Sequence, residues 1–207
     1  MLEARGISFS YPCGRTLFEG VDLAVAPGER VALSAPSGTG TTTLCRLLAG
    51  YLEPASGEVL CDGEPLPARG ACPVQLVMQH PELACDPLMR MGDALEEAGG
   101  ADEALLDVLG IERRWLRRFP HELSGGELQR FCVARALACE PRYLVADEAT
   151  TMFDAVSQAR IWRALLAVAS ERDMGVVLVS HSPALVRLVA TRSVDVAALV
   201  SGGGEGV

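Results

Sequence analysis

Short apolar runs separated by turn-forming residues dominate the first quarter of the chain. Leu2 to Ser10 and Val21 to Val25 alternate or cluster apolar residues between turn signals rich in Pro and Gly, as strands joined by tight turns do. Arg30 to Ser34 is a third apolar run, and it leads into a loop of Pro, Ser, Gly and Thr. Thr41 to Tyr51 then repeats apolar residues at helical spacing. The pattern therefore predicts a strand, a loop and a helix in succession.

Helical periodicity dominates the middle of the chain, and strand patterns return after it. The later strand candidates are continuous apolar runs of the kind found in buried parallel strands. Strands are expected at 58–61, 74–78, 143–146 and 176–179, and helices at 91–109, 126–138 and about 156–170.

The order of these elements predicts an α/β fold that a helical block interrupts. We expect a single domain over residues 1–207, in which 1–80 and 141–200 form the α/β core and 81–140 form an α-helical lobe. The last seven residues, 201–207, are small and polar, and they predict a flexible tail.

Composition narrows the class of function. The chain has 207 residues, of which 49% are hydrophobic and 22% are charged, and this is typical of a globular protein with a substantial core. Eighteen basic and 27 acidic side chains give a net charge of −9, and every basic residue is arginine because the sequence contains no lysine. This charge has the wrong sign for gripping a phosphate backbone over a broad face, so we expect no nucleic-acid partner.

Cysteine spacing and hydropathy indicate the cellular compartment of the protein. The seven cysteines form no C-x-x-C pair and lie in apolar segments, which favours reduced thiols in the cytosol over a metal site. The first residues, MLEARGISFSYP, contain no apolar h-region, and each apolar stretch is interrupted before about 18 residues. We therefore expect neither a signal peptide nor a membrane span, although the protein could dock on a membrane protein.

The loop from Ala35 to Thr43 is the first candidate for chemistry. A glycine-rich turn between a strand and a helix points backbone N–H groups inward, and the helix N-terminus adds positive potential, so the place suits a phosphate. In the P-loop pattern G-x-x-x-x-G-K-[ST], the first glycine is replaced here by Ala35 and the lysine by Thr41. Taken alone, the loop fits a plain turn that opens a helix equally well. The candidate phosphate-binding residues are Ser37, Gly38, Thr39, Gly40, Thr41, Thr42 and Thr43.

Three later motifs are Leu123-Ser124-Gly125-Gly126-Glu127, the apolar strand Tyr143 to Ala146 ending in Asp147-Glu148, and Ser180-His181. Taken with the loop, they resemble the ATP-binding cassette (ABC) ATPases in order and spacing over nearly the whole chain. The resemblance implies a P-loop NTPase (RecA-like) core with a parallel sheet, an N-terminal antiparallel β subdomain and an inserted α-helical lobe. It also implies an ATPase that dimerises head to tail, with two nucleotides held between the P-loop of one subunit and the LSGGE segment of the other.

The resemblance gives roles to the polar residues at the strand ends. Glu148 is implied as the general base for the attacking water, and His181 as the switch histidine that contacts the γ-phosphate. Asp147, Thr42 and Gln79 are implied as Mg²⁺ ligands, directly or through water, and Gln79 also links the core to the helical lobe. Each residue has a plainer interpretation: solvated carboxylates at a strand end, a structural histidine and a polar strand cap.

Three further positions are implied to face nucleotide. Ser124-Gly125-Gly126 would bind the γ-phosphate held by the partner, and the same residues fit an N-cap with Glu127 closing a capping box. Asp154 stands where the D-loop aspartate lies, although the usual Ser-Ala-Leu-Asp is Thr-Met-Phe-Asp here. Tyr11 stands where an aromatic stacks on adenine, and its alternative is a turn tyrosine beside Pro12.

A finer resemblance concerns the type of transporter. Segments Val77 to Pro81 and Phe119 to Arg130 look like the peptide/nickel importer branch, and Arg130 to Leu165 looks closest to its nickel-type cassettes. The resemblance implies a second cassette, two membrane permease subunits and an extracytoplasmic solute-binding protein as partners. It places the chain in the cytoplasm, peripherally on the inner face of the cell membrane. The solute does not follow from these residues.

The threonine at position 41 leaves two hypotheses open. A lysine ammonium on the β/γ-phosphates is worth roughly 1.5 to 3 kcal/mol, so its loss should weaken nucleotide binding about 10- to 100-fold. Arg46, about 7.5 Å and 140° further along the helix, should face away from the loop. The chain is either a working transport ATPase or a hydrolytically impaired cassette that completes the site of a competent partner. We prefer the ATPase; a soluble ABC protein of DNA repair is disfavoured by the charge of −9.

Overall fold

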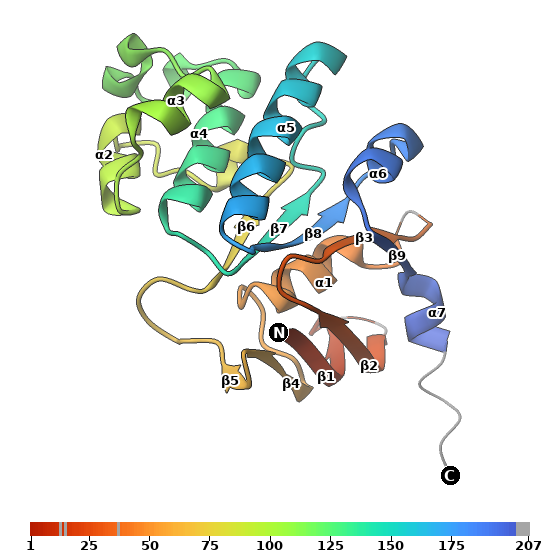
Figure 1. Cartoon of the computed structure of the whole chain (residues 1–207). Helices are drawn as coiled ribbons and strands as arrows, with labels where there is room; N and C mark the ends of the chain where they lie inside the picture. Colours follow the sequence, from red (N-terminus) through yellow and green to blue (C-terminus); the bar gives the residue numbers. More distant parts are fainter. Residues whose placement is uncertain (13, 15, 37, 202–207) are drawn as a thin grey trace.

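The first of two sheets is antiparallel. The computed structural model describes residues 1–12, 14, 16–36 and 38–201. Strand β1 pairs with β2 on one side and with β4 on the other, so that Leu2 lies opposite both Val25 and Cys61. The strand order is β2-β1-β4-β5, and Figure 1 shows this sheet beside the N-terminus. Its strands are β1 (Leu2–Ser10), β2 (Thr16–Val25), β4 (Ser56–Cys61) and β5 (Glu64–Pro65).

The second sheet is parallel and forms the centre of the fold. Its strand order is β6-β7-β8-β3-β9, so successive strands are joined by crossovers that carry helices. Every residue of β7 and β8 is buried, which explains their continuous apolar sequences. The strands are β3 (Arg30–Ser34), β6 (Val74–Val77), β7 (Tyr143–Asp147), β8 (Gly175–Val179) and β9 (Arg192–Asp195).

Side chains alternate between two apolar cores along the parallel strands. On β7, Leu144 and Ala146 pack into one core, whereas Tyr143 and Val145 pack into the other. The first core contains the helices of the lobe and α5, and the second contains α1 and the antiparallel sheet. The parallel sheet is therefore covered on both faces, and the expected α/β fold with a helical insertion is confirmed.

The helices fall into two groups. Figure 1 shows α2, α3 and α4 standing beside α5, away from the antiparallel sheet. Between β6 and β7 lie η1 (Pro81–Leu83), α2 (Met91–Glu97), α3 (Glu103–Leu109), η2 (Arg113–Arg117), η3 (Pro120–Glu122) and α4 (Gly125–Ala138). The remaining helices are α1 (Thr41–Leu48), α5 (Ala155–Glu171), α6 (Pro183–Val189) and α7 (Val196–Ser201).

The expected helical run 91–109 is two helices. Gly99 and Gly100 have φ of 110° and 81°, and the Gly100 N–H closes α2 by donating to Leu95 O at 2.8 Å. Asp102 then caps α3, because its side chain accepts from Leu105 N at 2.7 Å. The chain therefore turns between the two segments although their apolar spacing is continuous.

Other boundaries also differ from the sequence expectation. Helix α1 ends at Leu48 rather than Tyr51, because Gly50 adopts a φ of 74° and closes the helix. Strand β2 begins at Thr16 rather than Val21, and β9, which the pattern does not indicate, pairs with β3. Helix α7 extends to Ser201, the first residue of the expected tail, and 202–207 lie outside the described residues.

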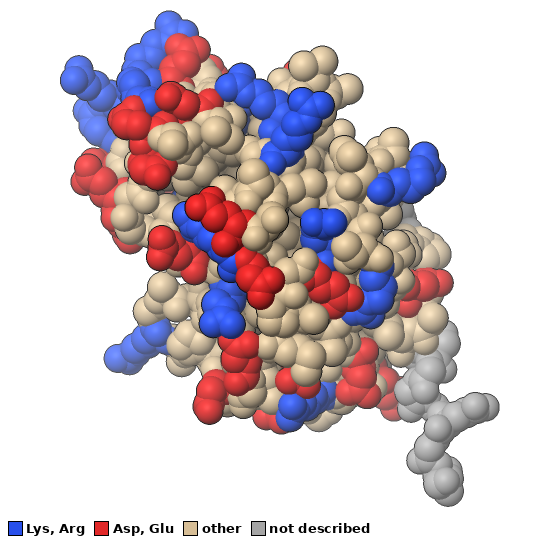
Figure 2. Space-filling model, viewed as in Figure 1, with Lys and Arg blue, Asp and Glu red and all other residues tan. Residues whose placement is uncertain are grey.

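Arginine and acidic side chains are interspersed over the surface. Figure 2 shows both signs mixed on the visible face, including the helical lobe. In the lobe Arg113 pairs with Glu103 and with Asp107, and Arg114 pairs with Glu112. Arg113 and Arg114 are therefore solvated and paired, while Trp115 itself is buried.

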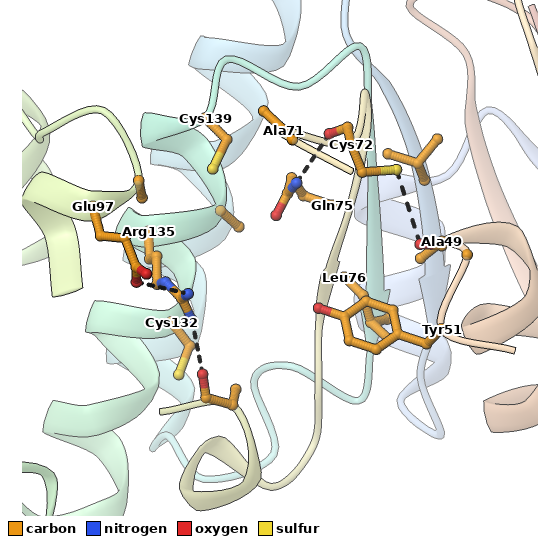
Figure 3. Close-up of a pocket in the computed structure, with 16 residues that line it drawn as sticks. Ala49, Tyr51, Ala71, Cys72, Gln75, Leu76, Glu97, Cys132, Arg135 and Cys139 are labelled. Carbon is orange, nitrogen blue, oxygen red and sulfur yellow. Dashed lines mark hydrogen bonds and ion pairs between the residues drawn. The ribbon is translucent and has the colours of Figure 1, made fainter. Parts of the chain in front are cut away.

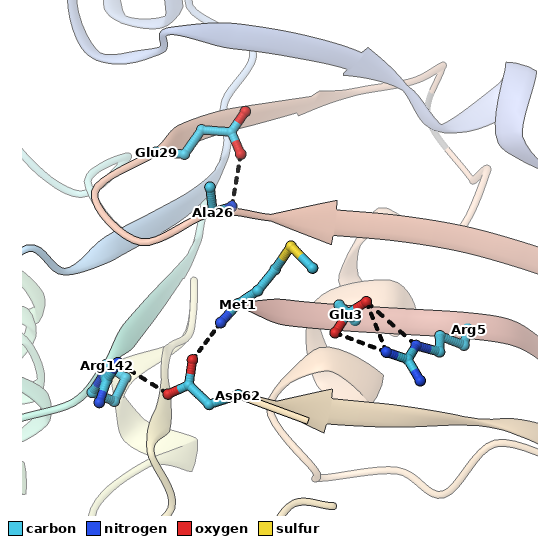
Figure 4. A network of polar contacts seen from close by, with 7 residues as sticks. All are labelled: Met1, Glu3, Arg5, Ala26, Glu29, Asp62 and Arg142. Carbon is cyan, nitrogen blue, oxygen red and sulfur yellow. Dashed lines mark hydrogen bonds and ion pairs between the residues drawn. The ribbon is translucent and has the colours of Figure 1, made fainter. Parts of the chain in front are cut away.

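Polar contacts tie the two sheets together near the N-terminus (Figure 4). Asp62, in the turn after β4, pairs with the Met1 ammonium and, at 3.0 Å, with Arg142 just before β7. The hydrogen bond from the Met1 ammonium lowers the pKa of Asp62. Glu29 likewise accepts from Ala26 N at 2.9 Å and from Arg192 on β9 at 2.7 Å. These exposed contacts fix the orientation of the sheets at small energetic gain.

Gly57 provides a direct test of the antiparallel pairing. It has a φ of 79°, and an added Cβ would lie 2.4 Å from the backbone oxygen of Arg5. Gly63, with a φ of 83°, has no atom within 4 Å of such a Cβ. Both alanine variants lose roughly 1–2 kcal/mol to the left-handed backbone, and Gly57→Ala loses about 1–3 kcal/mol more to overpacking. Urea denaturation should show this difference; equal losses would contradict the close approach.

Candidate functional site

The site lies at the carboxyl ends of the parallel strands. Strand β3 leads into the loop 35–40, β7 ends at Asp147 and is followed by Glu148, and β8 leads to Ser180-His181. Since β3, β8 and β7 are neighbours in the sheet, these three segments meet at one edge. This edge is where open α/β sheets bind ligands.

The loop before α1 depends on two glycines. Gly40, the N-cap residue of α1, has a φ of 101°, and a Cβ there would lie 2.7 Å from Leu17 Cδ2. Gly38 has a φ of 84°, and no atom lies within 4 Å of the position of its Cβ. The backbone at Gly38 is thus open to a ligand, and among the described residues no side-chain hydrogen bond caps the start of α1 at Gly40. Ser37, another expected phosphate-binding residue, lies outside the described residues.

Loop hydroxyls make distinct contacts. Thr39 turns its side chain back onto Pro36 O at 2.7 Å. Thr43 is buried, and its Oγ1 lies 3.1 Å from the hydroxyl of Tyr11, whose ring packs edge-on against Phe9. Tyr11 therefore lies beside the first turn of α1 and is 41% exposed, and its stacking on adenine stays a prediction. Thr41 is half-buried and Thr42 is exposed, both at the helix start.

Asp147 is the buried carboxylate of the site. It is only 5% exposed, and burial raises its pKa, while a hydrogen bond with the side chain of Thr42 acts in the opposite direction. The Glu148 charge also raises this pKa, and the Arg46 guanidinium lowers it. Arg46 is therefore close enough to act on the carboxylate. No described contact links it to the loop, and its facing away from the phosphates stays a prediction.

Glu148 is held between two partners. Gln79 Nε2 donates to its Oε2 at 3.0 Å, and His181 Nε2 lies 3.1 Å from its Oε1. The residue has a φ of 49°, a left-handed conformation that costs a non-glycine residue about 1–3 kcal/mol. Its N–H donates to Val179 O at 3.1 Å, which fixes the strained turn against β8. Three expected catalytic residues are therefore brought together around one carboxylate.

A second cleft contains the remaining expected residues. Ser124 caps α4: its Oγ accepts from Glu127 N at 3.3 Å, and its N–H donates to Glu127 Oε2 at 2.7 Å. This is the capping box that the sequence indicates. Asp154 caps α5 and accepts from Val156 and Ser157 at 2.9 and 3.0 Å. Ser124, Gly126 and Asp154 line one cleft of about 430 Å³, and no described residue of the loop 35–43 lines it. Gly125 lies beside this cleft, with Met152 Sδ 3.1 Å from the position of its Cβ.

Several positioning residues were not found from the sequence. Thr150 is buried, and its hydroxyl accepts from Gln158 and from Trp162, each at 3.0 Å, so it anchors the segment after Glu148. Gln129 donates to Met78 O at 3.0 Å and so fixes the backbone beside Gln79. Their places in the sequence carry no signal, because buried polar partners are determined by tertiary packing.

The donor set fits a cation that shares its coordination with a ligand. Among the described residues no group of three or more His, Cys, Asp or Glu side chains could hold a metal ion alone. Thr42 and Asp147 nevertheless place a hydroxyl and a carboxylate together, and Gln79 contacts the next carboxylate in the chain, that of Glu148. Mg²⁺ prefers such oxygen ligands and usually takes others from water and substrate phosphates.

We expect Asp147→Asn to stabilise the ligand-free protein. Because burial raises the pKa of Asp147, the ionised carboxylate opposes folding, and this destabilisation grows as pH rises through the folded-state pKa. Melting temperatures at pH 7 should therefore be higher for Asp147→Asn, and the gain should vanish below the ordinary aspartate pKa. Asp154→Asn is the control of opposite sign, since backbone hydrogen bonds lower the pKa of Asp154. Equal effects of the two variants would refute this account.

Comparisons with known proteins show the family to which this chain is similar. The family model described as ABC transporter matches residues 18–151. A protein of Brucella abortus, provisionally named as a peptide import ATP-binding protein, is 34% identical over 203 residues, covering 86% of this chain and 60% of that protein. The Fe(3+) ions import ATP-binding protein FbpC of Serratia marcescens is 34% identical over 192 residues, covering 87% and 55%.

A solved structure supports the fold. The dimeric structure of MJ0796, a bacterial ABC transporter cassette, matches with a TM-score of 0.80 at 22% identity and covers 95% of each chain. The present chain spans about 60% or less of the length of the two relatives above. No helix in the described part of the chain is long and apolar enough to cross a bilayer.

Proposed function

Because this chain belongs to the ABC transporter family of ATP-binding proteins, we propose that it binds ATP with Mg²⁺ at the loop 35–43 and hydrolyses it as the ATPase subunit of an importer. The observation that carries this proposal is the assembly of Gln79, Glu148 and His181 beside the Thr42–Asp147 pair. A general base, its orienting partners and oxygen ligands for a cation therefore share one edge of the sheet.

Each residue has a physical task in this reaction. Backbone N–H groups of the loop and of the first turn of α1 bind the phosphates. Thr42, Asp147 and Gln79 would hold Mg²⁺, which neutralises charge on the phosphates when it is bound. Glu148 accepts the proton of the attacking water at a carboxylate oxygen. Gln79 and His181 orient that carboxylate through their contacts at 3.0 and 3.1 Å.

The second cleft supports a head-to-tail dimer. Ser124, Gly126 and Asp154 gather in a cleft apart from the phosphate loop, so one chain presents two unlike parts of a site. We infer that the α4 N-terminus completes the nucleotide site of a second cassette, which is a copy or a relative of this chain. MJ0796, whose fold matches, is described as dimeric.

The importer role rests on the named relatives. Those relatives are named for import of peptide and of Fe(3+) ions. We propose import of a small solute of the peptide or nickel-chelate type, with permease subunits in the membrane and a solute-binding protein outside it. The chain would then act on the inner face of the cell membrane. The solute itself is selected by those other subunits.

The impaired-cassette alternative gains no support from the site. A degenerate site has no need of Glu148 in a strained turn with two partners, yet this chain maintains that arrangement. The replacement of lysine by Thr41 affects one phosphate contact and leaves the base and the cation ligands assembled. A working ATPase is therefore the function that the geometry favours.

Nucleotide binding by the purified chain tests the proposal. We expect a fluorescent ATP analogue to bind in the presence of Mg²⁺, to be displaced by ATP, and to be released when EDTA removes the cation. Phosphate release should accompany binding. Asp147→Ala should abolish the cation dependence, whereas Asp86→Ala, in an exposed loop outside the site, should retain it. Failure to bind ATP at millimolar concentration would overturn the proposal.

A further inference from the structure

Two thiols outside the nucleotide site contact one another. Cys85 follows η1, and Cys132 lies on α4, with 3.8 Å between their sulfur atoms although 47 residues separate them in the chain. We propose that Cys85 and Cys132 form a redox-active dithiol, which a low-molecular-weight disulfide oxidises to an internal disulfide that clamps the segment 78–85 to α4.

Helix α4 already holds this segment through one row of side chains. Gln129, Cys132 and Arg135 are spaced three residues apart and so face one side of the helix. Gln129 donates to Met78 O at 3.0 Å, and Arg135 donates to Ala84 O at 2.8 Å. Cys132 makes a long contact of 3.8 Å with Pro81 O. The contact at Cys132 is the weakest of the three. A disulfide between Cys132 and Cys85 would add a covalent bond of about 2.05 Å at this position.

Cys85 is the more accessible of the two thiols, because Cys132 is buried. Cys132 lines a cleft of about 570 Å³ together with Arg135 and Cys139 (Figure 3). Cys85 is only half-buried, at the surface end of the same contact. Figure 3 shows Arg135 beside Glu97, with which it pairs at 3.4 Å. A small disulfide therefore reaches the half-buried Cys85 first, and the Arg135 guanidinium is a cation close enough to act on that thiol.

The two thiols have unequal acidity. The hydrogen bond with Cys132 lowers the pKa of Cys85, and the Arg135 guanidinium acts in the same direction. The pKa of Cys132 is raised, first by its bond to Cys85 and then by burial. Cys85 is therefore the attacking thiolate and Cys132 the resolving thiol.

The exchange is balanced in two steps. Cys85 loses its proton to solvent, and its thiolate attacks the reagent disulfide, forming a mixed disulfide and releasing one reagent thiolate. Cys132 then gives its proton to that thiolate and attacks the Cys85 sulfur, which releases the second reagent thiolate, and this thiolate takes up the proton that Cys85 lost to solvent. Two protein thiols are oxidised and one reagent disulfide is reduced to two thiols. The clamped segment includes Gln79, so the thiol state bears directly on the nucleotide site.

Cross-linking in the native protein tests the dithiol. The protein is treated with oxidised glutathione, blocked with iodoacetamide and digested with trypsin. We expect the peptides 70–90 and 131–135 to be joined, with two hydrogens lost. Because peptide 70–90 also contains Cys72, the matched controls are Cys72→Ser and Cys139→Ser, which should form the same link. Cys85→Ser and Cys132→Ser should not form it.

Amide hydrogen exchange tests the clamp. Oxidation should slow exchange in the segment 80–85 at least 10-fold, and dithiothreitol should restore it, in the wild type and in Cys72→Ser. Replacement of Cys132 could fail because the variant does not fold. Cys85 is half-buried, so Cys85→Ser tests the same link without that difficulty. A link that disappears in Cys72→Ser, mixed glutathione disulfides without the internal link, or unchanged exchange on oxidation would each overturn the proposal. None of these measurements depends on ATP hydrolysis.

Discussion

Replacing Glu148 by Gln is expected to lower ATP turnover by about 100- to 10,000-fold while nucleotide binding is retained, because a neutral amide cannot accept the proton of the attacking water. The geometry favours a clean result. The carboxamide oxygen of the new side chain can still receive the hydrogen bond from Gln79, so the surrounding contacts of 3.0 and 3.1 Å need little rearrangement. Phosphate release under Mg²⁺ and saturating ATP measures the turnover, and analogue fluorescence measures the binding.

A matched control separates the loss of the general base from the loss of one negative charge. Glu171→Gln removes one negative charge at the exposed end of α5, which leads to the amino end of β8 and not to the carboxyl ends that form the site, and should turn over ATP at the wild-type rate. Turnover in Glu148→Gln within a few-fold of the wild type would show that Glu148 is not the base. Loss of binding in that variant would show instead that the carboxylate shapes the pocket.

The central strands of the parallel sheet could be predicted from local sequence, but its edge strand β9 could not. Strand β3 has the bounds that its apolar run predicts, because a strand buried on both faces requires a continuous apolar sequence. Strand β9 is mostly exposed and polar, and Arg192 is positioned by Glu29 at 2.7 Å. Its pairing is therefore specified by a residue far away in the sequence, which no local pattern reports.

In the candidate site, too, single residues could be predicted from the sequence but the contacts between them could not. Resemblance could indicate Glu148, Gln79 and His181 separately, but their meeting around one carboxylate depends on how three strand ends align. The contact of Cys85 with Cys132 was likewise unpredictable, since the sequence offers two isolated cysteines with no motif. Residue types and hydrophobic periodicity are properties of the local sequence, whereas buried polar contacts depend on tertiary packing.

Thr41→Lys is expected to tighten ATP binding by about 10- to 100-fold, because an ammonium at the start of α1 would add a charge-assisted contact of roughly 1.5–3 kcal/mol to the phosphates. Thr41 is half-buried at the first position of the helix, and the neighbouring backbone at Gly38 is open. A lysine there can extend along the loop without displacing packed atoms. Turnover should rise at least as much as affinity, because the same charge stabilises the transition state.

The comparison must exclude a general effect of one positive charge. Ser170→Lys adds the same charge near the C-terminal end of α5, at an exposed position, and should leave ATP affinity within two-fold of the wild type. Titration with a fluorescent analogue at several salt concentrations gives both affinities. If Thr41→Lys binds no better than Ser170→Lys, the loop does not wrap the phosphates in the manner proposed. If binding tightens while turnover stays constant, the missing lysine limits affinity alone, and Glu148 with its two partners already sets the rate.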